Sequence, residues 1–369
     1  MSLLQFPFRK NPTKSGATKS PEFTPALSAG LGPLKGKSFL STSDLTPKEL
    51  QLFIEAAVQA KELGRDALGQ PLKGRSIALV FFNPSLRTRV SMTVGISQLG
   101  GLAIPLEIGA GTWDLEHLTG VVMNGAKVEH VREAVPVLSQ YVDAIAVRCF
   151  PGLKDYALDA MDPVLASFRA HSSVPVINLE SAYWHPCQAL ADMMTIRELR
   201  GGFHRRKVVL TWANHPRPLP HAVPNSFAYA SAQCGVDLWI VAPEGYMLDD
   251  GFVQEMTRVA QSQGGTLTVT SDREAAYAGA DVVYAKSWAA RAFYGKPELD
   301  LERRKGLADW MVTEEWMSKT NQGIFMHCLP VRRNVVVADE VLDGPRSVVV
   351  AQAANRLHAQ RALLAGMFT

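Results

Sequence analysis

The stretch of sequence that decides the fold is SIALVFFNPSLRTR, residues 76–89. Its first seven residues are apolar or small and suit a buried strand, whereas Ser85 is a natural N-cap for a following helix. Met92, Ile96 and Leu99 then repeat at helical spacing and give that helix one apolar face. A buried strand that runs directly into a helix is typical of an α/β protein.

Short apolar runs alternate with helical stretches along the rest of the chain, which is 369 residues long. This alternation indicates two doubly wound parallel sheets, and at roughly 150 residues per domain the length suits two domains. We expect one domain at residues 35–188 and a second at 189–350, joined by a linking helix near 188–199. The other apolar runs, each expected to form a strand, are 144–147, 174–179, 208–212, 238–242, 267–269, 282–284, 323–326 and 348–350.

The composition argues against several classes of protein. Charged residues make up 20% and hydrophobic residues 47% of the chain, and the net charge is only +3. Such a weak positive excess argues against nucleic acid as the main partner. The basic triplets 205–207 and 303–305 are expected to be solvated surface. No apolar run approaches the roughly 18 residues of a membrane span.

Four cysteines, Cys149, Cys187, Cys234 and Cys328, lie far apart without a Cys-x-x-Cys pair. This predicts reduced thiols and neither a metal site nor a disulfide framework. Residues 1–34 lack the continuous apolar core of a secretory signal and are rich in Pro, Ser, Thr, Gly and Lys. We therefore expect a flexible extension on a cytoplasmic protein, with a transit peptide as the less favoured alternative.

Polar side chains follow several of the expected strands. Ligands of open α/β sheets bind beyond the carboxyl ends of the strands, so these residues are candidates for a binding site. Two facing domains would present them to one cleft. They are the segment 83–89, Arg148, Glu180, His185, Gln188, His215, Lys286, and the segment 327–332.

The helix start at Ser85 is a candidate anion site. A helix N-terminus offers free backbone N–H groups and a favourable dipole, and the hydroxyls of Ser85 and Thr88 add donors. The planar guanidinium of Arg87 matches the geometry of phosphate oxygens. An ordinary capped helix with surface arginines is the alternative.

Three motifs in order resemble the aspartate/ornithine transcarbamylase family. They are Ser-Leu-Arg-Thr-Arg at 85–89, His-Pro-Cys-Gln at 185–188 and His-Cys-Leu-Pro at 327–330, which Arg332 follows. The likeness runs from about residue 35 to the C-terminus. It implies transfer of a carbamoyl group from carbamoyl phosphate to an amine in arginine biosynthesis, without a metal or cofactor. It also implies that a C-terminal helix, residues 351–369, returns to the first domain.

The resemblance assigns roles to individual residues. Attack of a neutral amine on a carbonyl, with phosphate leaving, needs an anion clamp, donors for the developing oxyanion and acceptors for the amide nitrogen. The phosphate would be held by Ser85, Leu86, Arg87, Thr88 and Arg356. The carbamoyl oxygen would accept from Arg148, His185 and Thr88, and its nitrogen would donate to Gln188 and to the main-chain carbonyls of Cys328 and Leu329.

Two further residues carry implications beyond a single cleft. In family members that use acylated ornithines, a tryptophan at the place of Trp113 reaches the phosphate site of a neighbouring subunit, which implies a homotrimer with shared sites. Simple packing is the alternative for Trp113. A nucleophilic role for Cys328 is disfavoured, because it follows an apolar strand and free cysteines are usually buried.

The acceptor amine is inferred from what the chain lacks. Family members that use free ornithine carry an Asp-x-x-x-Ser-Met-Gly loop, which this chain does not have. Segments 215–220 and 280–288 instead resemble the N-succinylornithine/N-acetylornithine branch. In that branch the acylated amino acid is bound by residues that match Glu180, His215, Lys286 and Arg332.

Val128 bears on the acyl group. Acetyl-users carry glutamate at this place and succinyl-users carry proline. A glutamate would repel the free carboxylate of a succinyl group, whereas valine would not. Acetyl-users also carry a lysine near the position of Val336. We therefore expect N-succinyl-L-ornithine first and N-acetylornithine second, with loop packing as the plain alternative for Val128.

Two other functions compete with carbamoyl transfer. A nicotinamide-dependent dehydrogenase needs a glycine-rich turn after a strand, which residues 213–218 do not provide. A non-catalytic paralogue would be expected to have lost anion-site residues, whereas Arg87, Arg148, His185 and Gln188 are all present.

Overall fold

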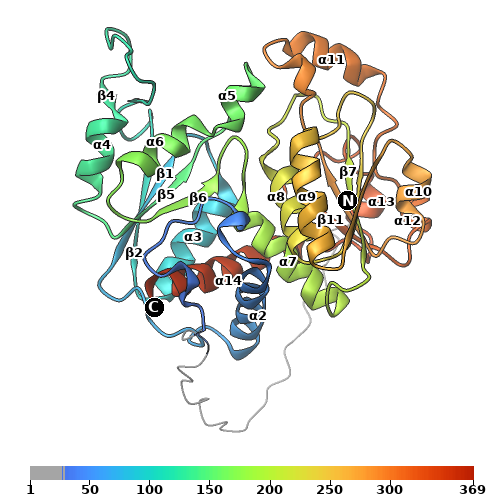
Figure 1. The fold of residues 1–369 in the computed structure, drawn as a ribbon, viewed down its shortest axis with the longest axis horizontal. Helices are drawn as coiled ribbons and strands as arrows, with labels where there is room; N and C mark the ends of the chain where they lie inside the picture. The colour runs from blue at the N-terminus through green and yellow to red at the C-terminus, as the bar shows by residue number, and fades with distance from the viewer. Residues whose placement is uncertain (1–26, 28–29) are drawn as a thin grey trace, which may run out of the picture.

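The computed structural model describes residue 27 and residues 30–369. Two parallel sheets form the centres of two domains that lie side by side (Figure 1). The first sheet has the order β2-β1-β5-β6: β1 (Ser76–Phe81), β2 (Leu102–Glu107), β5 (Ala144–Arg148) and β6 (Val176–Glu180). The second has the order β11-β10-β7-β8-β9: β7 (Lys207–Trp212), β8 (Asp237–Val241), β9 (Thr266–Thr270), β10 (Val282–Lys286) and β11 (Ile324–Met326).

Alternate residues of β1 face two different helical layers. Ile77 and Leu79 belong to the large apolar core that also contains Met92 of α3, whereas Ala78 and Val80 pack in a separate cluster on the opposite face of the sheet. Successive side chains of a strand point to opposite faces of the sheet, so a strand buried at every position indicates a sheet covered on both faces. The predicted doubly wound α/β fold is therefore confirmed. The first-domain helices are α2 (Pro47–Leu63), α3 (Leu86–Gln98), α4 (Val131–Leu138), α5 (Tyr156–Ala160) and α6 (Pro163–His171).

The second domain carries its longest helices on one side of its sheet. Helix α8 contacts β7 and β8, α9 contacts β9, and the two helices pack against each other. Short elements complete this domain. Its helices are α8 (Ala222–Gln233), α9 (Asp250–Ser262), α10 (Arg273–Tyr277), α11 (Pro297–Lys305), α12 (Glu314–Ser318) and α13 (Asp339–Leu342), with a 3₁₀ turn η3 (Arg291–Phe293).

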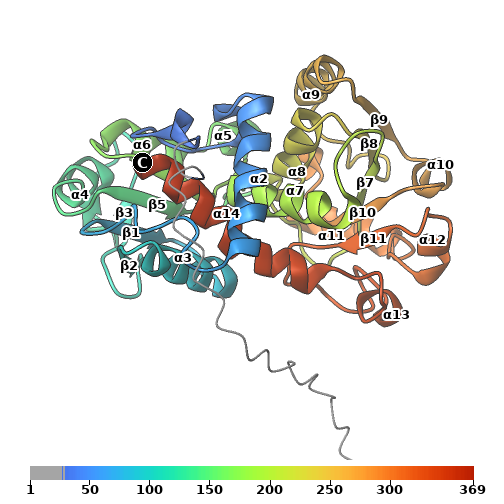
Figure 2. The same ribbon diagram turned by 90° about the horizontal axis from the view of Figure 1, so that it is seen from below.

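Two long helices tie the domains together. The predicted linking helix is α7 (Pro186–Arg200), which has Pro186 at its first position and ends at Gly201 with φ 73°. Helix α14 (Val349–Phe368) starts beside the second domain and packs against α2, α3 and α7 (Figure 2). Proline at a helix start and glycine in the left-handed region at its end fit their conformational preferences. No helix in the described part of the chain is long and apolar enough to cross a membrane.

One expected strand was wrong, and one strand was missed. Val349 and Val350 begin α14 instead of a strand and Val348 is its N-cap, because the residues that follow favour a helix and extend it back to these valines. The preceding Ser347 forms an isolated bridge to Phe325 of β11. The unpredicted strand β2 contains Pro105, which argues against a central strand. It lies at the edge of its sheet, where proline is tolerated.

The packed part of the first domain starts earlier than residue 35. Most of the expected extension lies outside the described residues, but Leu31 and Leu34 are buried around a 3₁₀ turn η1 (Gly32–Leu34). A Cβ on Gly366 of α14 would lie 2.6 Å from the carbonyl oxygen of Leu31. Glycine at this position therefore allows the N-terminal segment to lie directly against the C-terminal helix. A second 3₁₀ turn, η2 (Thr42–Asp44), precedes α2.

Candidate active site

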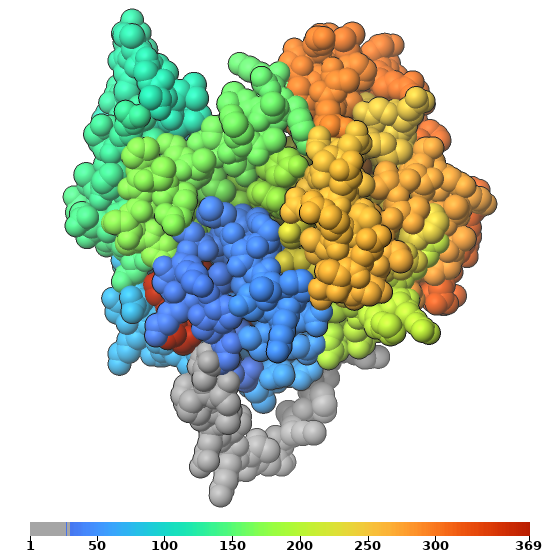
Figure 3. Space-filling view, viewed as in Figure 1, coloured from blue at the N-terminus to red at the C-terminus, as the bar shows by residue number. Residues whose placement is uncertain are grey.

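A cleft of about 520 Å³ lies where the strand ends of the two domains face each other. In the space-filling view, the first-domain segment around α5 and the second-domain segment around α11 meet at the top of the molecule (Figure 3). Most of the residues singled out in the sequence line this cleft. They are Ser85, Leu86, Arg87, Thr88, Arg148, Glu180, His185, Gln188, His215, Lys286, Cys328, Leu329 and Arg356.

The start of α3 forms one wall of the cleft. Ser85 caps the helix, since the backbone N–H of Thr88 donates 3.3 Å to its Oγ. Thr88 is fully buried, and its Oγ1 accepts a hydrogen bond of 2.7 Å from Nη2 of Arg356. The other terminal nitrogen of Arg356 donates 3.2 Å to Oε1 of Gln188. A helix N-terminus beside two arginines, Arg87 and Arg356, is a strong anion-binding arrangement.

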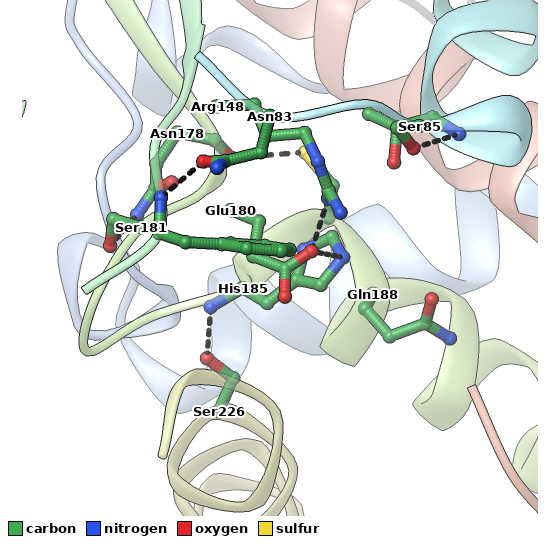
Figure 4. Close-up of polar contacts among 12 residues, drawn as sticks. Asn83, Ser85, Arg148, Asn178, Glu180, Ser181, His185, Gln188 and Ser226 are labelled. Carbon is green, nitrogen blue, oxygen red and sulfur yellow. Dashed lines mark hydrogen bonds and ion pairs between the residues drawn. The ribbon is translucent and has the colours of Figure 1, made fainter. Parts of the chain in front are cut away.

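A carboxylate lies between two donors deeper in the cleft (Figure 4). Glu180 ends β6, and its Oε2 accepts from Nη1 of Arg148 at the end of β5. The same oxygen is 3.3 Å from Nε2 of His185. The backbone N–H of His185 donates 2.7 Å to Oγ of Ser226, which fixes the segment that precedes α7. Three residues predicted to share a site, two at strand ends and one at the start of α7, are thus in contact.

The His185 imidazole is neutral in this environment. Complete burial, followed by the positive charges of Arg356 and Arg148, holds its pKa well below the usual value. Its Nδ1 and the Nε of Arg148 have no hydrogen-bond partner among the described residues. Buried polar atoms are rarely left unpaired, so these two are candidates for ligand contacts.

The second domain contributes a basic wall. Lys286 ends β10, and His215 follows β7. Arg332 does not line the cleft itself, but its Nε donates 3.1 Å to Nε2 of His215. Burial lowers the pKa of His215 to about 4, so the ring is neutral and can accept this hydrogen bond. Lysine and arginine here can pair with a carboxylate.

One residue of the basic triplet 303–305 is buried, contrary to the expectation of a solvated surface. Arg304 is 3% exposed, and Nη1 donates 2.9 Å to Oγ of Ser287 and 3.3 Å to the carbonyl of His215. Its Nη2 donates 2.8 Å to the carbonyl of Trp288, and Asp300 balances its charge. Arg304 therefore fastens together the loops that carry His215 and Lys286. Its neighbours Arg303 and Lys305 are exposed.

Trp113 and Val128 do not join the other candidates. They are 67% and 61% exposed and lie beside the short strands β3 (Leu115–Glu116) and β4 (Glu129–His130), away from the residues that line the cleft. A single chain therefore does not bring them to its own cleft.

Sequence reasoning missed several apolar residues of the cleft. Phe150 lies two positions beyond Arg148, whose guanidinium carbon is 4.6 Å from the centre of its ring. Val223, near the start of α8, is another lining residue. The only signal for Phe150 was its closeness to Arg148 in the sequence.

The cleft favours polar chemistry over thiol chemistry. Burial raises the pKa of the Cys328 thiol, and the residue is only 7% exposed. A nucleophilic cysteine requires the opposite, an accessible thiolate. Within residues 27 and 30–369, no group of three His, Cys, Asp or Glu side chains could hold a metal ion.

Two family models match the chain. The carbamoyl-P binding domain of aspartate/ornithine carbamoyltransferase matches residues 37–198, and the Asp/Orn binding domain matches residues 221–367. The chain belongs to the aspartate/ornithine carbamoyltransferase family. The prediction of a carbamoyltransferase is therefore confirmed, and the dehydrogenase alternative is wrong.

The relatives of this carbamoyltransferase include two kinds of acylornithine carbamoyltransferase. N-acetylornithine carbamoyltransferase of Xanthomonas campestris pv. campestris is 44% identical over 334 residues, which are 90% of this chain and 97% of the relative. N-succinylornithine carbamoyltransferase of Bacteroides thetaiotaomicron is 41% identical over 303 residues, covering 82% and 90% respectively.

A solved structure is similar over nearly the whole carbamoyltransferase chain. It is a variant of N-acetyl-L-ornithine transcarbamylase with one glutamate replaced by valine, complexed with carbamyl phosphate and N-succinyl-L-norvaline. It has 44% sequence identity and a TM-score of 0.85, and the match covers 90% of this chain and 99% of the other.

Proposed function

We propose that this enzyme transfers the carbamoyl group of carbamoyl phosphate to the side-chain amine of N-succinyl-L-ornithine in arginine biosynthesis. The products are N-succinyl-L-citrulline and phosphate. The observation that carries the proposal is the single cleft that combines the N-terminus of α3 with Arg148, His185 and Lys286. Such a cleft offers an anion site, carbonyl-oxygen donors and a cation for an acceptor carboxylate.

Each step of the proposed reaction uses side chains that line the cleft. Ser85, Arg87, Thr88 and Arg356 hold the phosphate. Arg148 donates to the carbamoyl oxygen as negative charge develops on it, and His185 does so with the one N–H group of its neutral ring, which it directs to the substrate in place of Glu180. The amine lone pair forms the new C–N bond while the C–O bond to phosphate breaks. The departing phosphate takes the bonding electrons, and the proton that the amine nitrogen loses passes to this phosphate, which leaves as hydrogen phosphate. Preorganised donors stabilise such a transition state more than the ground state.

Glu180 is suited to the acceptor side of the reaction. Its carboxylate lies against Arg148 and His185 and is therefore close to where the reacting amine must approach. Lys286 binds the α-carboxylate of the acylated amino acid, and Arg332, which donates a hydrogen bond to the cleft residue His215, provides a second cation for it. The acyl group then extends away from the reacting centre.

The acyl specificity comes from a neighbouring subunit in this proposal. Trp113 and Val128 are exposed and outside their own cleft, which supports a homotrimer in which they complete the cleft of the next subunit. A relative whose glutamate is replaced by valine has been solved with a succinyl ligand, and the exchange has the same chemistry as the difference at Val128. N-acetylornithine is the second candidate, because a relative with that name is 44% identical, compared with 41% for the N-succinylornithine relative.

Parallel assays test the proposal. Purified enzyme with carbamoyl phosphate should show its highest kcat/KM with N-succinylornithine, a lower value with N-acetylornithine and none with free ornithine. Equal values for the two acylated substrates would contradict the succinyl assignment, and activity on free ornithine alone would contradict both.

A further inference from the structure

A chain of buried polar side chains lies directly beneath the cleft. Asp192, one turn after Gln188 on α7, is fully buried. Its Oδ1 accepts 2.8 Å from Nε2 of Gln188 and 2.6 Å from Nε2 of Gln352 on α14. One carboxylate oxygen therefore holds two amide side chains from two different helices.

These contacts determine which end of the Gln188 amide faces the cleft. Arg356 can only donate hydrogen bonds, and Asp192 Oδ1 accepts two of them. Only one orientation of the amide satisfies both neighbours, with Nε2 toward Asp192 and Oε1 toward Arg356 at 3.2 Å. The amide oxygen is thus presented on the cleft side, where it can accept from an N–H group.

Gln352 links Asp192 to the loop after β11, which also lines the cleft. While its Nε2 donates to Asp192, its Oε1 accepts 2.9 Å from the backbone N–H of His327. His327 immediately precedes Cys328 and Leu329, which line the cleft. The start of that loop is therefore held in place through Gln352.

We propose that Asp192 is a positioning residue for carbamoyl transfer, which orients the Gln188 amide and the loop after His327 so that both present acceptors to the carbamoyl nitrogen. The inference rests on the proposed function, in which Gln188 and the carbonyls of Cys328 and Leu329 bind that nitrogen. Without an acceptor at Asp192, the buried amide N–H groups of Gln188 and Gln352 lose their shared partner. The Gln188 amide then keeps its contact with Arg356 but loses the acceptor that fixes its nitrogen, so its oxygen is held less firmly on the cleft side.

Two variants of Asp192 with similar side-chain size separate the effect of its hydrogen-bond acceptor from the effect of its charge. Asp192→Leu removes the acceptor, whereas Asp192→Asn keeps Oδ1. Burial raises the pKa of the Asp192 carboxyl to about 7, so a neutral asparagine is a close substitute. A small displacement of a reacting group can cost about 100-fold in rate. We expect Asp192→Leu to lose about that factor in kcat and to bind carbamoyl phosphate more weakly, and Asp192→Asn to restore most of the loss.

The binding of inorganic phosphate distinguishes a loss of positioning from a general disruption of the cleft. It probes the start of α3 without a carbamoyl group. Because Thr88 still holds Arg356 in each variant, the Kd of phosphate, measured by calorimetry, should change much less than the Kd of carbamoyl phosphate. Gln352→Met provides a second test if Asp192→Leu does not fold: kcat should fall while phosphate binding is kept. A folded Asp192→Leu enzyme with wild-type kcat, or an Asp192→Asn enzyme as impaired as Asp192→Leu, would overturn the proposal.

Failure of the proposed function would be seen separately. Wild-type enzyme that turns over no acylornithine would refute the acceptor assignment. The affinity of the variants for carbamoyl phosphate can be measured without an acceptor substrate. If Asp192→Leu bound carbamoyl phosphate as tightly as the wild type, the role of Asp192 would still be overturned.

Discussion

Arg356 on the C-terminal helix donates a 2.7 Å hydrogen bond to the hydroxyl of Thr88 at the start of α3, across 268 residues of sequence. Both side chains are buried, so the contact forms only when α14 has packed against α3. The proposed phosphate site is therefore built from two distant parts of the chain, and its formation requires the whole fold.

Arg356→Lys should weaken carbamoyl phosphate binding. Lysine carries the charge but cannot donate to Thr88 and Gln188 with one planar group. We expect a loss of about tenfold or more, which is roughly 1.4 kcal/mol, measured as Kd by calorimetry. Thr88→Val should weaken binding as well, and Thr88→Ser, which keeps the hydroxyl, should lose much less. Unchanged affinity in both Arg356→Lys and Thr88→Val would exclude the proposed phosphate contact.

Replacing Arg304 should weaken binding of the acylornithine acceptor and leave binding of carbamoyl phosphate unchanged. Its guanidinium fastens the loops of His215 and Lys286, and neither loop contributes to the start of α3. Arg304→Gln should raise KM for the acylornithine by about tenfold, as expected when a residue that supports a binding site is lost. The Kd of carbamoyl phosphate should stay unchanged.

The neighbouring Arg303 provides a matched control for this prediction. It belongs to the same triplet and helix but is exposed. Arg303→Gln should leave both constants unchanged. If Arg303→Gln and Arg304→Gln raised KM equally, the effect would come from the surface charge of α11 and not from the buried contacts.

Residues at strand ends could be predicted because topology alone brings them together. Parallel strands of one sheet end at the same edge, so Arg148 and Glu180 had to lie close to each other once their strands were recognised. The same reasoning placed Lys286 at the cleft. The capped start of α3 followed from local sequence at Ser85.

Other parts of the cleft depend on packing that no local pattern records. Arg304 stands between two exposed basic residues, and only the loops folded against α11 bury it. The link between Asp192 and Gln352 joins helices that are 160 positions apart in sequence. Strand β2 was missed because Pro105 opposes a strand locally, and its edge position compensates.

Acid should destabilise the fold through His221. This residue is fully buried, its Nε2 lies 2.9 Å from the carbonyl of Ala289, and burial lowers its pKa from 6.5 to about 4. Between these two values the unfolded chain binds a proton that the folded chain does not, so stability falls as the pH falls. The slope for one such group is at most about 1.4 kcal/mol per pH unit.

His221→Gln tests this sign, because glutamine can still donate to Ala289 but does not titrate. The melting temperature of the wild type should fall more steeply than that of His221→Gln between pH 6.5 and pH 4.5. The exposed His204 is the control, and His204→Gln should follow the wild type. Parallel curves for wild type and His221→Gln would show that His221 is not the titrating group.

Val128→Glu should move acceptor preference from the succinyl to the acetyl substrate. A new carboxylate close to the acyl group repels the free carboxylate of succinyl and has no such effect on acetyl. We expect the ratio of kcat/KM for the two substrates to change by about tenfold, or roughly 1.4 kcal/mol. Val128→Gln adds similar bulk without charge and should change the ratio much less. Equal losses on both substrates in Val128→Glu would mean that Val128 only packs its loop. Because Val128 lies outside the cleft of its own chain, a selective change would also support a cleft completed by a neighbouring subunit.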